Sequence, residues 1–412
     1  MNSPLVFADT AGDLLALPEK PAQVAEPVWC QSLAHGIPGI VLLHTELAAA
    51  DRAPWQRVQD WLSAATTGVV TGGESSHPFH GTPALAAALA HAADHLPGSY
   101  ARALDQLNST IDSDVLRRVD AAHARIDSGR TPDLAEFDAI RGLAGYGAYL
   151  LRHHRASTAL PAVLSYLVRL TEPLTVNGQT IPGWWTWTGP SGTSDDRFPH
   201  GHANTGVAHG IGGPLALLGL AARADVCVPG QRAAITTILA WLDRWQTDTP
   251  GGVVWPYWIT MKHLRAGQWE PDGPMRPSWC YGAAGLARVQ QLAAIATGDF
   301  TRQHAAERAL VRAVSDPARL AVTSGGSLCH GFAGLAHLAR RAAADAHRGN
   351  RIRLEAAAPG LLACALQPSR EPKEVVKTIT ADTGLGLLEG VAGVALAALT
   401  TNPGWDTSLL TA

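Results

Sequence analysis

The chain has 412 residues and a formal net charge of −3, with 46% hydrophobic and only 16% charged residues. This composition predicts a well-buried globular protein and argues against intrinsic disorder. The sequence has no basic cluster of the kind that binds nucleic acid or an anionic membrane. It also has no apolar run of about 18 residues that would span a bilayer, and its N-terminus lacks a signal-peptide pattern.

The cysteines are few, odd in number and widely spaced: Cys30, Cys227, Cys280, Cys329 and Cys364. Such a pattern favours thiols or a metal site in a reducing compartment over a disulfide framework. We therefore expect a cytoplasmic protein.

Seven segments along the chain share a pattern in which a glycine is followed, three positions later, by a second small residue within an apolar run. The first glycines are, in chain order, Gly36, Gly81, Gly142, Gly210, Gly282, Gly331 and Gly390. Each run is typical of a helix buried on all sides, with the two small residues on one face that a neighbouring backbone approaches. More amphipathic stretches at 114–126 and 231–246 would form outer helices. The sequence therefore predicts an all-α fold, an α/α toroid, with an open helical solenoid as the alternative.

The residue before each first glycine is polar or ionisable: His35, His80, Arg141, His209, Tyr281, His330 and Glu389. One position further back, the fifth and sixth segments carry Cys280 and Cys329. Two of only five cysteines thus share one register in consecutive repeats. If their helices are neighbours, the two sulfurs lie side by side.

Together with the adjacent His330, the two cysteines form a set of three soft or borderline ligands. Three such ligands and an open fourth position are typical of a catalytic zinc site. A zinc-bound thiol is deprotonated at neutral pH, so the site would activate the thiol of a substrate. His209 could reach the same site in space. The alternative is that the buried cysteines act only as small hydrophobic residues.

Three motifs resemble the lanthionine synthetase C-like family, the cyclases of lanthipeptide biosynthesis. They are W-C-Y-G at 279–282, C-H-G at 329–331 and A-H-G-I-G-G at 208–213, and the likeness extends over essentially the whole chain. The resemblance implies a free-standing cyclase with one α/α toroid domain over residues 1–412, built of seven inner and seven outer helices. It also implies a small insertion within residues 92–135. The family's zinc ligands fall on Cys280, Cys329 and His330, with one zinc ion per chain.

The resemblance further implies that a peptide thiolate adds to dehydroalanine or dehydrobutyrine and closes a lanthionine or methyllanthionine ring. By the same likeness, His209 is a proton donor, Asp138 and Arg276 are catalytic residues, and Tyr281 has a supporting role. From the residues alone, Asp138 could instead cap the third inner helix. Arg276 could belong to a structural ion pair, and His209 could be a core histidine.

The implied partners are a dehydrated precursor peptide (leader plus core), a lanthipeptide dehydratase and an exporter, through which the protein would associate with the membrane. The residues are also compatible with other functions. A related enzyme that adds glutathione to dehydroamino acids would share all three ligands. A zinc-containing peptide-binding scaffold would need no catalytic residues. A toroid prenyltransferase subunit fits less well, because its zinc set includes a carboxylate.

Overall fold

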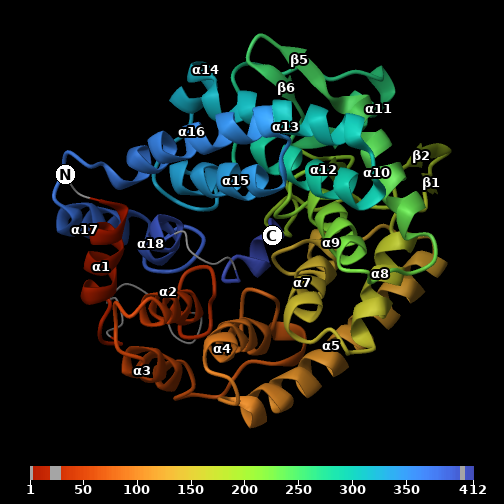
Figure 1. The fold of residues 1–412 in the computed structure, drawn as a ribbon. Coiled ribbons are helices and arrows are strands. Elements are labelled where there is room, and N and C mark those ends of the chain that lie inside the picture. Colours follow the sequence, from red (N-terminus) through yellow and green to blue (C-terminus); the bar gives the residue numbers. More distant parts are fainter. Residues whose placement is uncertain (1–2, 19–28, 400–403) are drawn as a thin grey trace. The chain divides into compact units, whose positions relative to one another are not determined.

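Helices make up most of the protein in the computed structural model, which describes residues 3–18, 29–399 and 404–412 (Figure 1). Within these residues there are 18 α-helices, two short 3₁₀ helices (Gly73–Ser75 and Thr407–Leu409) and seven strands of two or three residues. The predicted all-α class is therefore confirmed.

One helix follows each of the seven repeated glycines. These helices are α2 (Ile37–Ala49), α4 (Thr82–His95), α7 (Leu143–His153), α9 (Gly212–Arg223), α12 (Ala283–Thr297), α15 (Phe332–Asp345) and α18 (Val391–Leu399). Their apolar composition predicts burial on all sides, and every residue of α18 is indeed buried.

The remaining helices include the more amphipathic ones. They are α1 (Pro4–Leu14), α3 (Gln56–Ala65), α5 (Ala101–Asp127), α6 (Leu134–Phe137), α8 (Ala159–Arg169), α10 (Gln231–Trp245), α11 (Met261–Ala266), α13 (Phe300–Ser315), α14 (Pro317–Ala321), α16 (Arg348–Leu366) and α17 (Pro372–Thr383). The two amphipathic stretches predicted from the sequence lie in α5 and α10. In α10, one face is buried through Ile235, Ile238 and Leu242. The region 92–135, for which the sequence suggested a small insertion, contains the long helix α5.

The repeated glycines differ from the expectation in one respect, because only the second of each pair lies on the helix. Gly282, for example, precedes α12 as its N-cap and has a φ of 153°, a value that disfavours side chains. The second glycine, Gly285, lies in the first turn of α12. A methyl group there would collide with the carbonyl oxygen of Trp279, six residues earlier. The two glycines therefore allow the loop before α12 to pack tightly against the first turn of α12.

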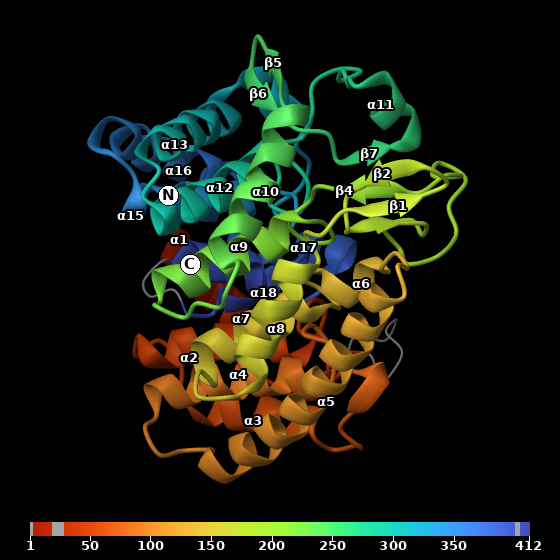
Figure 2. The same ribbon diagram turned by 90° about the vertical axis from the view of Figure 1, so that its right-hand side faces the viewer.

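Three small antiparallel sheets, which the sequence did not predict, lie to one side of the neighbouring helices (Figure 2). The strands are β1 (Leu174–Val176), β2 (Gln179–Ile181), β3 (Trp185–Thr186), β4 (His202–Asn204), β5 (Thr247–Thr249), β6 (Gly252–Val254) and β7 (Trp258–Thr260). Strand β4 is central in the order β3-β4-β7, with Asn204 opposite Trp258. This sheet brings segments far apart in sequence to the same place, and α11 packs against β7.

The chain forms two compact units. The first unit comprises 1–111, 324–340 and 355–406, and the second comprises 112–323, 341–354 and 407–412. In the first unit α2 packs against both α3 and α4, as Figure 1 shows, and α18 packs against α1 and α2. Buried Glu46 of α2 joins α4, because its Oε1 lies 2.7 Å from Nε2 of His91. The seventh repeat thus contacts the first, an arrangement that an open solenoid lacks.

In the second unit, α7 packs against α8 and α9, α9 against α12, and α12 against α13. A buried arginine of α12, Arg288, is 1% exposed. It donates from Nη2 to Asp345 (2.8 Å) and from Nε to the carbonyl of Thr411 (3.0 Å). Trp279, just before α12, donates to the carbonyl of Leu409 (2.9 Å). The residues 407–412 are thereby fastened to the base of the loop that carries Cys280.

Candidate metal and catalytic site

Backbone hydrogen bonds join the loops that precede consecutive repeat helices of the second unit. The amide of Ala139 donates to the carbonyl of Ala208 (3.1 Å), and the amide of Val207 donates to the carbonyl of Cys280 (2.9 Å). These residues stand two or three positions before the first glycines of the third, fourth and fifth repeats. The register inferred from the sequence therefore corresponds to a physical connection, and Cys280 is held beside the loop of His209.

The first unit repeats the same connection. The amide of Cys329 donates to the carbonyl of Leu388 (2.9 Å), and the amide of Leu388 donates to the carbonyl of Ala34 (3.0 Å). The next bond in this series runs from the amide of Leu33 to the carbonyl of Phe79 (3.0 Å). Backbone hydrogen bonds thus join the loops of the sixth, seventh, first and second repeats, and the side chains at equivalent positions of these loops lie near one another.

His209 is held by the buried carboxylate of Asp138, the aspartate that precedes the third repeat. Its Nδ1 lies 2.7 Å from Oδ2 of Asp138, whose side chain is only 1% exposed. The other oxygen of Asp138 accepts hydrogen bonds from the backbone amides of Arg141 (2.6 Å) and Gly142 (2.8 Å). The N-cap of the third inner helix α7 is Gly142, so Asp138 does not cap that helix as one reading of the sequence predicted. Asp138 instead holds the loop before α7 through these two amides and orients the imidazole. With Nδ1 donating to Asp138, Nε2 remains for proton transfer.

Tyr281, which follows Cys280, has a fixed hydroxyl. The side-chain NH₂ group of Asn204 donates to this hydroxyl (2.8 Å), while its side-chain oxygen Oδ1 accepts from the backbone amide of Gly206 (3.0 Å). The Tyr281 ring lies 6.5 Å from that of His209, measured between centroids. Tyr281 and His209 consequently lie beside each other, next to the Cys280 loop.

Arg276 precedes the Cys280 loop and is half-buried. Among the described residues its Nε is buried and has no hydrogen-bond partner. Its backbone carbonyl accepts from the hydroxyl of Tyr257 (3.4 Å). Burial raises the pKa of Tyr257, so this phenol stays protonated at neutral pH, although the positive charge of Arg276 acts in the opposite direction. The guanidinium is thus available to an anionic group of a ligand.

In the first unit, His330 is paired with a glutamate of the seventh repeat. Its Nδ1 lies 3.1 Å from Oε1 of Glu389. Burial alone would raise the pKa of Glu389, but hydrogen bonds from His330, Cys329 and Ser327 outweigh burial and hold it below its usual value. A carboxylate on Nδ1 leaves Nε2 of His330 as the ring nitrogen for a metal.

The residues predicted from the sequence thus divide between the units. Asp138, His209, Arg276, Cys280 and Tyr281 belong to the second, and Cys329 and His330 belong to the first. Each unit presents its residues from the loops before the repeat helices. In the part of the chain that the structure describes, none of the five cysteines forms a disulfide.

Sequence reasoning missed several supporting residues of these loops. Glu389 had a signal, because it occupies the same register position as His209 and His330. Asn204 and Tyr257 had none beyond their nearness to recognisable motifs. Four tryptophans near these loops differ in burial. Trp184, Trp185 and Trp255 are buried in the core, whereas Trp258 is half-exposed. Among the described helices, none has the length and apolar character needed to cross a membrane.

Comparison with known proteins agrees with this architecture. A family model described as lanthionine synthetase C-like protein matches residues 27–407. One relative is the nisin biosynthesis protein NisC of Lactococcus lactis subsp. lactis, which is 23% identical over 314 residues, covering 74% of this chain and 72% of the relative. The solved structure of a nisin cyclase matches with a TM-score of 0.77 at 19% identity, covering 94% of this chain and 93% of the other. The structural likeness confirms the predicted α/α toroid, and the family match shows that the chain belongs to the lanthionine synthetase C-like proteins.

Proposed function

We propose that this protein is a zinc-dependent lanthipeptide cyclase. It joins the cysteine thiols of a peptide to dehydroalanine or dehydrobutyrine residues of the same peptide. The observation that carries the proposal is the hydrogen-bonded loop cluster of the second unit, in which His209 is held by buried Asp138 beside the Cys280 loop. The family membership and the similarity to a nisin cyclase support the same reaction.

The metal set we propose is Cys280, Cys329 and His330, with one zinc ion per chain. Two thiolates and an imidazole suit zinc and leave a fourth position for a substrate sulfur. Cys280 and Cys329 occupy the same position in consecutive repeats, and consecutive repeats are joined at this position within each unit. Glu389 supports the assignment as a hydrogen-bond partner that orients His330. When bound, zinc would lower the pKa of the substrate thiol and hold it as a thiolate.

The protein's own residues would then complete the addition. As the sulfur bonds to the β-carbon of the dehydroamino acid, the electrons of the carbon–carbon double bond move toward the α-carbon and its carbonyl. The Arg276 guanidinium is suited to stabilise the enolate that develops. His209, oriented through Nδ1 by Asp138, delivers a proton from Nε2 to the α-carbon. The substrate thiol loses one proton and the α-carbon gains one, so the ring forms without loss of atoms.

The substrate in this proposal is a dehydrated precursor peptide with a leader and a core. A dehydratase must act first, because serine and threonine side chains have to become alkenes before a thiol can add. We place the reaction in the cytoplasm, where thiols remain reduced, and expect an exporter to follow.

The proposal is tested with a synthetic peptide that carries one dehydroalanine and one cysteine. Ring closure leaves the peptide mass unchanged but removes the thiol that an alkylating reagent would label. We expect the wild-type protein to contain one zinc ion and to abolish labelling. Cys280→Ala and Cys329→Ala should lose both zinc and ring closure. Cys227→Ala, which changes an exposed cysteine, is the matched control and should keep both.

The same assay separates the alternatives. A peptide that gains the mass of glutathione when glutathione is supplied would favour the glutathione-adding enzyme. Stoichiometric zinc with peptide binding but no change in labelling would favour a peptide-binding scaffold. A wild-type protein without zinc would refute the metal assignment.

A further inference from the structure

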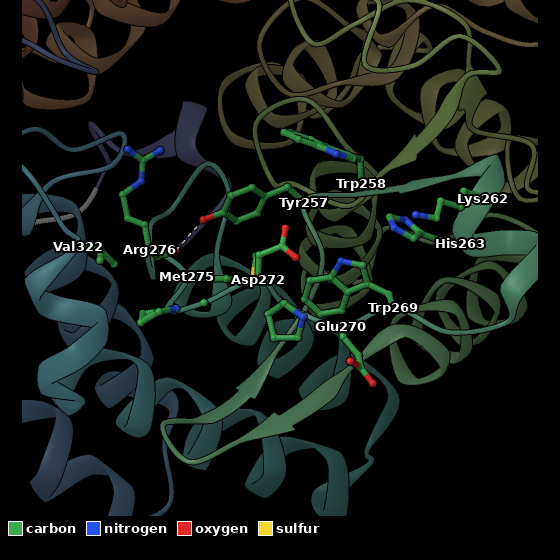
Figure 3. A pocket seen from close by; sticks show the side chains of 13 residues that line it. Tyr257, Trp258, Lys262, His263, Trp269, Glu270, Asp272, Met275, Arg276 and Val322 are labelled. Carbon is green, nitrogen blue, oxygen red and sulfur yellow. Dashed lines mark hydrogen bonds between the residues drawn. The ribbon is translucent and has the colours of Figure 1, made fainter.

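A pocket of about 630 Å³ opens in the second unit next to the catalytic loops (Figure 3). Three aromatic side chains, Tyr257, Trp258 and Trp269, form much of its wall. In the view of Figure 3, Trp258 and Trp269 are set apart from each other, and the Asp272 carboxylate appears between them. The volume falls within the range of about 300–1,000 Å³ that is usual for ligand sites. Of the residues that line the pocket, the function described above uses only Arg276.

The pocket shares a wall with the reaction site. The rings of Tyr257 and Trp258 lie 5.6 and 6.3 Å from the ring of Tyr281, measured between centroids. Tyr281 in turn lies beside His209, and Arg276, four residues before Cys280, lines the pocket. A peptide chain that leaves the reacting residues on this side therefore passes directly into the pocket.

The charges of the pocket balance. Lys262 and Arg276 are positive, and Glu270 and Asp272 are negative. Burial and neighbouring Lys262 lower the pKa of His263, which is therefore neutral at pH 7. A pocket without net charge does not select a strongly acidic or basic segment. Its aromatic walls favour an apolar or aromatic side chain.

Three of these charged side chains have no hydrogen-bond or salt-bridge partner among the described residues of the protein. They belong to Lys262, Glu270 and Asp272. Such groups can bind the amides and carbonyls of an extended peptide without breaking contacts within the protein.

We propose that this pocket is a substrate subsite that binds the peptide segment flanking the reacting residues, with an apolar or aromatic side chain packed against Trp269. This inference rests on the proposed function, because it takes the substrate to be a peptide. It adds a determinant of substrate preference: precursor segments with a bulky apolar residue next to the ring-forming residues bind more tightly than segments with alanine there.

The test uses unreactive synthetic peptides in which serine replaces the cysteine and alanine replaces the dehydroalanine. One pair carries Phe or Ala immediately before the alanine, and a second pair carries Phe or Ala immediately after the serine. Dissociation constants are measured by fluorescence anisotropy with the zinc-loaded wild type and with Trp269→Ala. Trp269 is the cleaner choice, since Trp258 also packs on Tyr281 and on Arg197. Trp187→Ala is the matched control, because Trp187 is 43% exposed and lies outside the pocket.

In at least one pair, we expect Trp269→Ala to weaken binding of the Phe peptide about tenfold, the loss expected for an aromatic contact and its buried area. The Ala peptide should change less than about twofold by the same reasoning, and Trp187→Ala should change neither. With reactive versions of these peptides, KM should rise for the Phe form while kcat stays the same. Equal weakening of the Phe and Ala peptides, or no weakening, would overturn the subsite. If the wild type closes no ring, the proposed function fails instead, which the thiol-labelling assay reports independently.

Discussion

Replacing Asp138 by asparagine isolates its role in orienting His209. Asp138 is 1% exposed and uses both oxygens, one toward the amides of Arg141 and Gly142 and the other toward Nδ1 of His209. An asparagine keeps a carbonyl oxygen for the two amides and places its NH₂ group against the imidazole. Because that group only donates, Nδ1 must accept, and the ring proton moves to Nε2. The substitution therefore changes the tautomer of His209 while keeping the fold of the loop.

The size of the effect follows from the bond that is lost. A hydrogen bond between an imidazole and a buried carboxylate stabilises the charged ring by about 1.5–3 kcal/mol. Each 1.36 kcal/mol corresponds to about a tenfold change in rate, so ring closure should slow by roughly 10- to 150-fold. The melting temperature should hardly change, since the asparagine still accepts both backbone amides. Asp138→Ala should slow the reaction too, but it should also destabilise the protein by about 1–3 kcal/mol, because two buried amides lose their partner.

The assay is single-turnover ring closure of the synthetic dehydroalanine peptide, with zinc content measured in parallel. Asp133→Asn makes the same chemical change at an exposed position whose side chain forms no capping hydrogen bond, and it should match the wild type. A rate for Asp138→Asn within about threefold of the wild-type rate, at full zinc content, would refute the orienting role, since roughly tenfold is the smallest loss expected.

Two further predictions concern zinc and acid. Glu389→Gln should weaken zinc binding about 10- to 100-fold by removing the carboxylate from Nδ1 of His330; chelator competition measures this, and unchanged affinity would contradict it. Burial lowers the pKa of both His44 and His202 from 6.5 to about 4. The unfolded chain therefore binds more protons between pH 6.5 and 4, so stability falls as pH falls through this window, by about 2 kcal/mol per histidine at pH 5. Urea unfolding at pH 7 and pH 5 checks this, and His202→Phe should halve the decrease; an unchanged decrease would exclude His202 as its source.

The position of the seven repeat helices could be predicted because a side chain at their glycines would collide with neighbouring backbone. A side chain at Gly285 would strike the Trp279 carbonyl, and one at Gly282 would strike its own loop. These contacts lie within a few residues of sequence, so the pattern marks where each loop ends and each helix begins. The amphipathic helix α10 could be predicted for the same local reason, since its buried face repeats with helical spacing.

Long-range partnerships could not be predicted from the residues alone. Asp138 and His209 are 71 positions apart, and Asn204 and Tyr281 are 77 apart. Only the resemblance to a known family placed Asp138 near the chemistry. The strands escaped prediction because two or three residues are too few for an alternating pattern to emerge. Strand β7 places Trp258 in the wall of the pocket. Because this short strand could not be predicted, the proposed peptide subsite could not be predicted either.

The hydrogen bonds between loops show that the backbone holds the loops together, while their side chains remain available for chemistry. They use only backbone amides and carbonyls, such as those of Val207 with Cys280 and of Cys329 with Leu388. The side chains of these loops are therefore not needed for the connection between them. In the last four repeats, the residue before the first glycine is His209, Tyr281, His330 or Glu389. One structural device thus presents the proposed proton donor, an aromatic side chain, the proposed metal ligand and the carboxylate paired with that ligand from equivalent places. A substitution at any of them should change the chemistry far more than the stability of the fold, whereas a side chain at Gly285 should do the reverse.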